Sequence, residues 1–320
     1  MSKRPIYYRV IDGILSEWAT FNKNKIEKGE KIVIAGTARS GTTWLAQILS
    51  TVPGYPVIWE PLHRHTAPTA AESGIEWHEY VSENDKSNKT KYIDGIWNGE
   101  HLSTEIVSRV LLRPLEYLRF RGFIIKTVNG LGVTPYVSQK DKTKLVILVR
   151  HPCSVVSSKI EKGGWENLRI NGENPYPKYF LDKYPKIGEI YESIDSIEER
   201  LALDWAASYT VPFFELEKGE AYFLFYEKLI SKVGHELNSL FSYLNINDKY
   251  LSKAVESANL ASPTTEPNST LRRGRDQLRK WSDKLTLDQI DRITNVVCQT
   301  RVGELYDGDH FIPVMNHDPL

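Results

Sequence analysis

Residues 31–44 read KIVIAGTARSGTTW, and this segment leaves few choices of fold. The β-branched residues Ile32, Val33 and Ile34 predict a strand buried on both faces, as central parallel strands are. The run WLAQILSTV that follows repeats apolar residues at helical spacing until Pro53-Gly54 stops it. A strand, a glycine-bounded loop and a helix in this order aim backbone N–H groups at one point, which suits a phosphate. The segment therefore predicts an α/β architecture with an anion site.

Gly36 and Gly41 bracket this loop with the spacing of a nucleotide phosphate loop, but Thr42 stands where nucleoside triphosphatases carry a lysine. That lysine reaches the β- and γ-phosphates of a nucleotide, whereas the only cation of this loop is Arg39. A glycine-bracketed turn also arises in parallel sheets for purely geometric reasons, with Arg39 in solvent. Because strand and helix patterns flank the loop, we expect it to hold an anion without being an ordinary triphosphate site.

The composition limits the classes of partner. The chain has 320 residues, 41% of them hydrophobic, and a formal net charge of +0, so no global field attracts nucleic acid or an anionic membrane. No apolar run is long enough to span a membrane, and the N-terminus lacks a signal-like apolar segment. The only cysteines, Cys153 and Cys298, are too few for a disulfide framework or a zinc site. These features predict a cytoplasmic protein with no nucleic-acid partner and no transmembrane segment.

Five segments have the pattern of buried strands, with helical patterns between most of them. They lie near residues 31–36, 56–59, 122–127, 144–149 and 221–225. Alternation of this kind predicts a parallel β-sheet flanked by helices. No internal repeat and no low-complexity linker divides the chain, so we expect one α/β domain over residues 1–320.

Two stretches resist assignment to helices or strands. Residues 161–194 are rich in Gly, Pro, Tyr and Asn, and we expect a loop that covers the substrate. Residues 261–281 include a basic run, with five positive charges between Arg272 and Lys280. A short basic run is often only a solvated face, but here it is also suited to closing over a bound anion.

A second anion signature occupies residues 144–158, KLVILVRHPCSVVSS. Arg150 lies at the carboxyl end of a predicted strand, and Pro152 suits the first turn of a helix. Ligands of open α/β sheets sit beyond the carboxyl ends of the strands, so Arg150 and Ser158 are candidates to bind one phosphate. The alternative is that Arg150 merely caps a neighbouring helix.

These motifs resemble those of the sulfotransferases that use 3′-phosphoadenosine 5′-phosphosulfate (PAPS). TARSGTTW resembles their 5′-phosphosulfate loop, and RHPCSVVSS resembles their 3′-phosphate motif. FLFYEKLI, LDWAASY and LRRGRDQLRKW are similar to further segments of that family, in the same order along the chain. The resemblance implies a P-loop-like α/β fold, PAPS as sulfuryl donor, adenosine 3′,5′-bisphosphate as product, and no metal.

The resemblance also assigns site residues. The residues implied for the 5′-phosphosulfate are Arg39, Ser40, Gly41, Thr42 and Thr43, and those implied for the 3′-phosphate are Arg150, Ser158, Arg272, Arg273 and Gly274. Trp44 is expected to stack near the adenine, or alternatively to lie on the buried face of its helix. Arg39 is expected to stabilise the leaving oxygen electrostatically, since a guanidinium stays charged.

The general base is a separate question. Many cytosolic sulfotransferases carry a histidine where this chain has Val128, after Lys126-Thr127, and valine accepts no proton. Glu60 follows the second predicted strand in the sequence WEPLHRH, and it resembles a Glu-Pro pair of carbohydrate sulfotransferases. We therefore expect Glu60 to act as general base, with His63 and His65 in reserve. Lys126 is expected to assist the leaving oxygen.

Structural alternatives remain for this group of residues. Glu60 is also suited to a structural ion pair with Arg39 or Arg64, and Lys126 to a buried pairing at its strand end. For the whole protein the alternatives are a P-loop kinase-like phosphotransferase and a non-catalytic module that binds a sulfated ligand. Arg39 and the Glu60-Pro61 pair favour a carbohydrate or glycolipid acceptor. The sequence predicts no oligomeric state.

Overall fold

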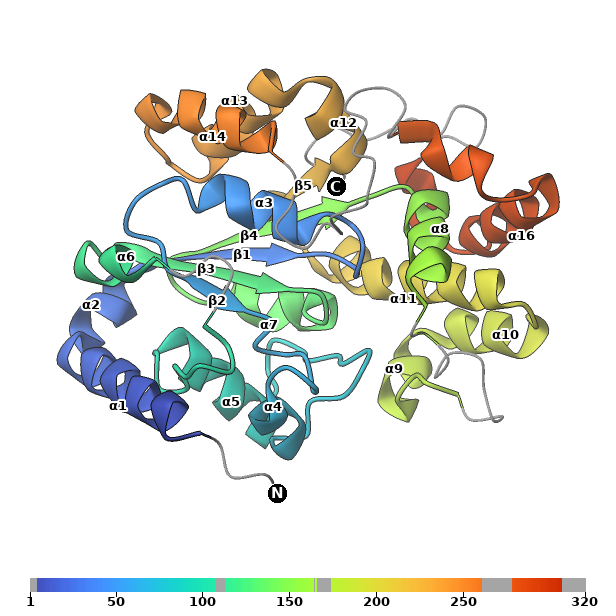
Figure 1. Ribbon diagram of the computed structural model, residues 1–320. Coiled ribbons are helices and arrows are strands. Elements are labelled where there is room, and N and C mark those ends of the chain that lie inside the picture. The colour runs from blue at the N-terminus through green and yellow to red at the C-terminus, as the bar shows by residue number, and fades with distance from the viewer. Residues whose placement is uncertain (1–4, 108–112, 164, 166–173, 261–277, 307–320) are drawn as a thin grey trace.

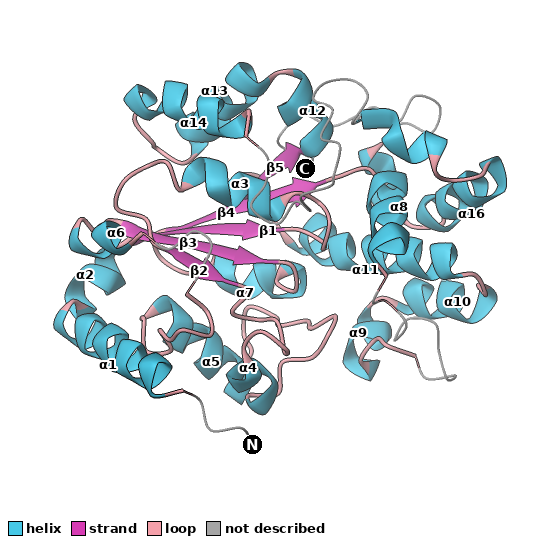
Figure 2. Cartoon of the chain, in the orientation of Figure 1, coloured by secondary structure: helices cyan, strands magenta, loops and turns pink. Residues whose placement is uncertain are grey.

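The computed structural model describes residues 5–107, 113–163, 165, 174–260 and 278–306. In this part of the chain, five parallel strands form one sheet with helices on both faces (Figure 1, Figure 2). The strands are β1 (Glu30–Ala35), β2 (Val57–Trp59), β3 (Gly122–Thr127), β4 (Thr143–Val149) and β5 (Ala221–Phe225). The α/β fold class and all five predicted strands are confirmed.

The strand order β2-β3-β1-β4-β5 puts β1 at the centre of the sheet. Ile34 of β1 is paired with Lys126 of β3 on one side and with Val146 of β4 on the other. Because all strands run parallel, their carboxyl ends meet at one edge. The segments after β1, β2, β3 and β4, which carry the predicted site residues, therefore start from the same edge of the sheet.

Side chains of β1 alternate between two hydrophobic clusters, as strand geometry requires. Ile32 and Ile34 pack in a cluster with α3, α12, α13 and α14, and Val33 and Ala35 pack in a larger cluster on the other face. The helices of the first cluster are α3 (Thr42–Leu49), α12 (Tyr226–Ser231), α13 (Val233–Tyr243) and α14 (Leu251–Ala258). Those of the second include α1 (Ile6–Phe21), α2 (Lys23–Lys28), α5 (Asn88–Trp97), α7 (Thr134–Ser138), α8 (Pro152–Lys162), α11 (Ile197–Glu215) and α16 (Leu287–Cys298).

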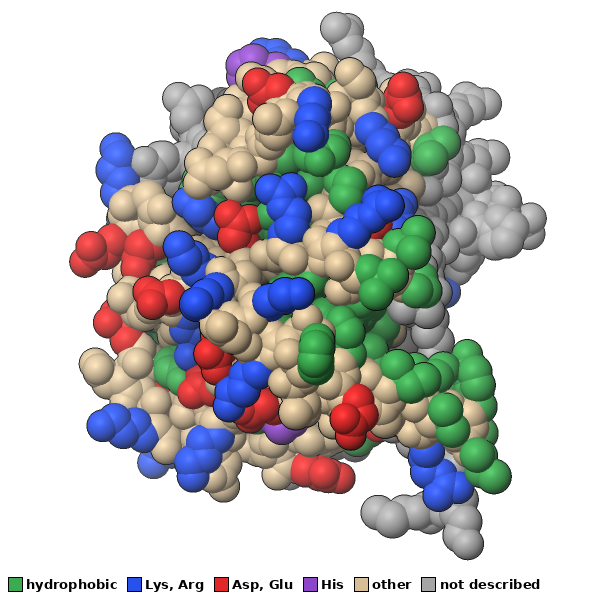
Figure 3. Space-filling model, turned by 90° about the vertical axis from the view of Figure 1, so that its left-hand side faces the viewer, with side chains coloured by type: hydrophobic (Ala, Val, Ile, Leu, Met, Phe, Trp, Pro, Cys, Tyr) green, Lys and Arg blue, Asp and Glu red, His purple; other side chains and the backbone are tan. Residues whose placement is uncertain are grey.

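Short helical turns complete the described chain. They are α4 (Pro68–Glu72), α6 (Pro114–Leu118), η1 (Leu131–Val133), η3 (Asp248–Tyr250), η4 (Lys280–Asp283) and η5 (Arg301–Leu305). Figure 3 shows positive and negative side chains interspersed on one face of the molecule, in keeping with the balanced charge. None of the described helices combines the length and apolar character that a membrane-spanning segment needs.

The expectation of a continuous loop over residues 161–194 is wrong for its second half. This part forms α9 (Lys178–Lys183) and α10 (Pro185–Ser193). Phe180, Ile187 and Ile190 are buried in the core, and burial of this apolar face stabilises both helices. The Pro and Tyr content of the segment is untypical of helices, so its composition predicted a loop. Pro185 begins α10 rather than breaking it, because proline is tolerated in the first turn. Most of the predicted basic loop, residues 261–277, lies outside the described residues.

Candidate active site

The loop between β1 and α3 has a backbone that requires its two glycines. A Cβ atom on Gly36 would lie 2.7 Å from the carbonyl oxygen of Leu148, and one on Gly41 would lie 2.9 Å from the ring of Tyr226. Gly41 has φ 100° and Arg39 has φ 72°, both in the left-handed region. The loop therefore folds tightly over the end of β4, which brings Arg39 out at the sheet edge.

Buried hydrogen bonds fix the loop. The Ser40 hydroxyl, which is fully buried, donates to the carbonyl oxygen of Thr37 at 2.7 Å. Tyr209 of α11 accepts from the backbone N–H of Thr37 at 3.3 Å and donates to the carbonyl oxygen of Leu148 at 2.6 Å. Burial raises the pKa of Tyr209 to about 12, so its hydroxyl stays protonated. Tyr209 thus ties the phosphate loop to β4.

Two arginines and a serine meet beside this loop. Nε of Arg39 donates to Oγ of Ser158 on α8 at 2.9 Å. Nη1 of Arg150, at the end of β4, donates to the carbonyl oxygen of Arg39 at 2.9 Å, and its guanidinium lies 4.5 Å from the ring centroid of Tyr226. In this arrangement Arg150 binds the loop instead of capping a neighbouring helix. Its Nε atom is buried and has no hydrogen-bond partner among the described residues.

Glu227, which the sequence analysis did not single out, anchors the turn after Arg150. Its carboxylate accepts from the backbone N–H of His151 at 3.0 Å and from the hydroxyl of Tyr306 at 3.0 Å. The imidazole of His151 stacks on Trp281 at 5.1 Å, and burial together with the adjacent Arg150 lowers the pKa of His151 to about 3. The Tyr-Glu pair in FLFYEKLI was the available signal for this role.

Glu60 and Lys126 form a buried ion pair between β2 and β3. Nζ of Lys126 donates to Oε1 of Glu60, and the backbone N–H of Val128 donates to Oε2 at 2.8 Å. The two residues are 5% and 3% exposed. Arg64, a predicted alternative partner of Glu60, instead pairs with Glu76 at 2.6 Å. The structure therefore shows the alternative that was considered for Lys126, a buried ion pair at the end of its strand.

His63 lies near this ion pair and packs against other aromatic rings. Its Nδ1 is 3.3 Å from the backbone nitrogen of Thr66, and its ring makes edge contacts with His65 and Trp77. Burial lowers the pKa of His63, although the charge of Glu60 opposes this effect. His63 is therefore neutral near neutral pH and able to accept a proton.

A cavity of about 530 Å³ opens at Thr37 and Ala38 of the phosphate loop. Aromatic and imidazole side chains form much of its wall, including His63, His65, Trp77, Trp165 and Phe180. Neither Glu60 nor Lys126 is among the described residues that line it, although Val128 is. A ring-bearing acceptor fits a lining of this kind, next to the place where the loop would hold its anion.

A second ionic cluster lies in the wall of the same cavity. Oδ2 of Asp204 on α11 accepts from Nζ of Lys159 on α8, and Oδ1 lies 3.4 Å from Nε2 of His78. The side chains of His78, Asp204 and Lys159 are 10%, 13% and 1% exposed. Burial by itself would raise the pKa of Asp204, but Lys159 and His78 outweigh it and the pKa is lowered. No local sequence pattern indicates this cluster, because its members are far apart in the chain.

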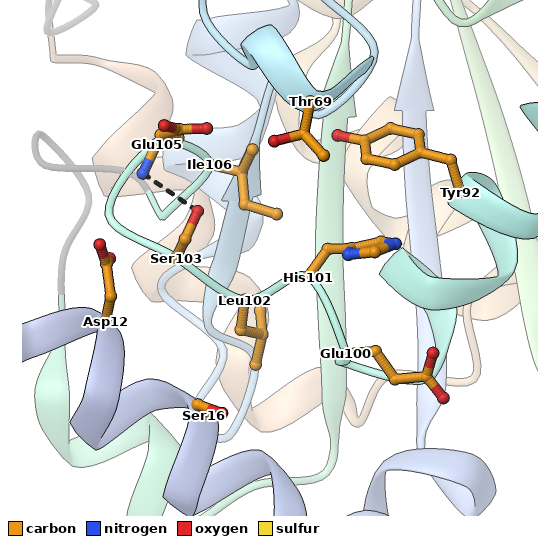
Figure 4. A pocket seen from close by; sticks show the side chains of 10 residues that line it. All are labelled: Asp12, Ser16, Thr69, Tyr92, Glu100, His101, Leu102, Ser103, Glu105 and Ile106. Carbon is orange, nitrogen blue, oxygen red and sulfur yellow. Dashed lines mark hydrogen bonds between the residues drawn. The ribbon is translucent and has the colours of Figure 1, made fainter. Parts of the chain in front are cut away.

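A smaller cavity of about 330 Å³ lies between α1 and the segment after α5 (Figure 4). Asp12, Tyr92 and His101 line it, and the imidazole of His101 stacks on Tyr92 at 4.9 Å. No residue of the phosphate loop lines this cavity. Within the described ranges, no group of three or more His, Cys, Asp or Glu side chains is arranged to hold a metal ion.

The remaining predicted residues divide into two sets. Trp44 is partly buried, donates from its indole to the carbonyl oxygen of Ala258 at 3.2 Å and packs on Tyr226 at 5.6 Å. These contacts favour the alternative of an aromatic side chain on the packed face of α3, and its role near adenine stays a prediction. Arg272, Arg273 and Gly274 lie outside the described residues.

A family model described as the sulfotransferase domain matches residues 29–305. The match covers most of the chain, so the chain belongs to the sulfotransferase family. No curated protein matches it in a search of such proteins.

Solved structures of sulfotransferases resemble the chain at low sequence identity. A sulfotransferase domain from the curacin biosynthetic pathway has 17% identity and a TM-score of 0.44, with 84% of this chain and 98% of that chain covered. Mouse sulfotransferase SULT7A1, complexed with PAP, has 16% identity and a TM-score of 0.39, with 88% and 90% covered. The sulfotransferase domain of the Synechococcus PCC 7002 olefin synthase has 16% identity and a TM-score of 0.42, with 84% and 94% covered.

Proposed function

We propose that this protein transfers the sulfuryl group of PAPS to the hydroxyl group of an acceptor. The observation that carries the proposal is the meeting of Arg39, Arg150 and Ser158 beside the phosphate loop. Buried polar atoms normally have hydrogen-bond partners, and Nε of Arg150 has none among the described residues. A phosphate with several acceptor oxygens would satisfy it. The donor set therefore fits an adenosine 3′,5′-bisphosphate moiety.

The residues divide between the two ends of the donor. Backbone N–H groups of the loop and of the first turn of α3, with the side chains of Thr42 and Thr43, would hold the 5′-phosphosulfate, while the buried Ser40 hydroxyl supports the loop through Thr37. Arg150 and Ser158 would bind the 3′-phosphate, joined by Arg272, Arg273 and Gly274. When bound, PAPS supplies a sulfuryl group that is already activated for transfer. The chain's own contribution is positioning and charge.

Arg39 would stabilise the negative charge that develops on the leaving oxygen. Its guanidinium stays charged at all accessible pH values, so its effect is electrostatic rather than proton donation. Nε of Arg39 contacts Ser158, which holds this cation against α8. Lys126 would add a second positive charge from the neighbouring strand end.

For the proton of the acceptor, the sequence motif favours Glu60 as general base. Its position after β2 puts it at the same sheet edge as the phosphate loop, within the pair that it forms with Lys126. Replacing Glu60 by Gln tests this role. Retention of near-wild-type turnover, with donor binding intact, would remove Glu60 from the mechanism.

For the acceptor, we propose a hydroxyl of a carbohydrate or glycolipid. The tryptophan rings of Trp77 and Trp165 in the cavity wall suit stacking against a sugar ring. We also propose a cytoplasmic location, as predicted from the sequence. The P-loop kinase-like alternative loses support because the chain belongs to the sulfotransferase family.

The test is sulfate transfer from labelled PAPS to a panel of sugars, glycolipids and phenols, together with calorimetric binding of adenosine 3′,5′-bisphosphate. Transfer to any acceptor supports the proposed reaction, and the preferred acceptor identifies its class. Binding without transfer to any acceptor would favour a non-catalytic module. Absence of binding would contradict the assignment of the donor site.

A further inference from the structure

The cluster of His78, Asp204 and Lys159 is a buried ionic group that lines the large cavity. Asp204 divides its two oxygens between the partners, one for Lys159 and one for His78. His78 has a left-handed backbone conformation, φ 51°, which is uncommon outside glycine, and Glu60 shares it with φ 49°.

The ring of His78 is arranged to accept a proton from its free side. Nε2 faces the carboxylate of Asp204 at 3.4 Å, and no hydrogen bond from the described residues engages Nδ1. The other charged or titratable groups that face the ring are Lys159 of α8 and Tyr176, whose ring lies 4.5 Å away. The carboxylate of Glu79, the next residue, turns instead toward Lys89 and Tyr179.

Glu60 is less well placed to meet an acceptor. Both of its carboxylate oxygens are already engaged, one by Lys126 and one by the backbone N–H of Val128. To accept a proton, this carboxylate would have to give up one of these two donors. His78 lines the cavity that starts at Thr37, whereas Glu60 does not.

We propose that His78, oriented by Asp204, is the general base that takes the proton of the acceptor hydroxyl in this cavity. This inference rests on the sulfuryl transfer proposed above and changes only the residue that receives the proton. Glu60 then serves to hold Lys126 at the strand end. Lys159 serves to keep Asp204 ionised, so that the carboxylate can stabilise an imidazolium.

The acceptor oxygen forms a bond to the sulfur of PAPS, and the bond between that sulfur and the oxygen of the 5′-phosphate breaks with its electron pair on the oxygen. The acceptor proton moves to Nδ1 of His78, and the resulting imidazolium is paired with Asp204. After the sulfated product leaves, the imidazolium returns its proton to water. Burial lowers the pKa of the free imidazole, so the base form is present near neutral pH.

The test compares acceptors that do and do not need a base. Water and aliphatic alcohols must lose a proton during attack, whereas p-nitrophenol is largely ionised already at about pH 8. His78→Asn, which tolerates the left-handed backbone, should lower sulfate transfer from labelled PAPS to water or butanol about 100-fold. Transfer to p-nitrophenol should stay within about threefold of wild type. A purely structural role would affect all these acceptors alike.

Two further measurements separate the outcomes. The kcat/KM of wild type should decline below an apparent pKa under 6.5, and this acid limb should vanish in His78→Asn. His101→Asn, at the smaller cavity, is the matched control and should change neither quantity. Equal loss with all acceptors, unchanged activity, or a wild type that binds adenosine 3′,5′-bisphosphate but transfers to none of them would overturn the role of His78. Failure of wild type to bind adenosine 3′,5′-bisphosphate would instead contradict the proposed function itself.

Discussion

Replacing Arg150 by Ala removes the guanidinium that joins β4 to the phosphate loop. In the structure this group donates to the carbonyl oxygen of Arg39 at 2.9 Å, lies over the ring of Tyr226 and leaves Nε without a partner among the described residues. The substitution therefore removes a donor for a bound phosphate and a support of the loop at the same time. We expect weaker binding of adenosine 3′,5′-bisphosphate.

The size of the effect follows from the kind of hydrogen bond that is lost. A hydrogen bond to a charged group is worth about 1.5–3 kcal/mol, which corresponds to a Kd that is about 10- to 150-fold higher. Arg150 is half-buried, so solvent screens it less than an exposed arginine and the upper part of this range applies. Arg150→Lys keeps the charge but loses the planar fork, so its Kd should fall between those of wild type and Arg150→Ala.

Isothermal titration calorimetry with adenosine 3′,5′-bisphosphate and with adenosine 5′-monophosphate measures this effect. If Arg150 binds the 3′-phosphate, the preference for the bisphosphate should shrink in Arg150→Ala, because loss of loop support weakens both ligands alike whereas loss of the donor weakens only the bisphosphate. Arg301→Ala, which removes an arginine that is 66% exposed, is the control for loss of a surface charge. An unchanged preference in Arg150→Ala would refute the assignment of Arg150 to the 3′-phosphate.

Three other predictions concern stability. Gly36→Ala should lower the free energy of unfolding by about 1–3 kcal/mol in chemical denaturation, since the new Cβ would lie 2.7 Å from the carbonyl oxygen of Leu148. Lys126→Met should lower it by about 3–5 kcal/mol because a buried charge on Glu60 is left unpaired, and the double variant with Glu60→Gln should lose less. His151 has a folded pKa of about 3 against 6.5 when unfolded, so protonation favours the unfolded chain as the pH falls between these values. His151→Asn, which keeps a side-chain acceptor for the helix cap, should remove up to about 1.4 kcal/mol per pH unit of this acid sensitivity, measured by denaturation at several pH values.

Local patterns were sufficient for the sheet. Each strand is a short apolar run bounded by turns. Because strands of a parallel sheet are buried on both faces, this apolar run alone indicates a strand, without knowledge of the strands that pair with it. The phosphate loop was equally local, because the positions of Gly36 and Gly41 follow from the tight turn between β1 and α3. For α9 and α10 the sequence failed, since their stability comes from burying Phe180 and Ile187 against distant elements.

The sequence by itself determined the α/β fold, the anion-binding loop and the strand-end Arg150, because each depends on residues that are neighbours in the chain. Only the tertiary structure decided how the charged side chains are paired. Glu60 meets Lys126 through strand pairing, and Asp204 meets both Lys159 and His78 where α8, α11 and the segment after α4 come together. Such contacts depend on packing between elements that are far apart in the sequence, and the low dielectric of the interior then sets which groups hold their charge.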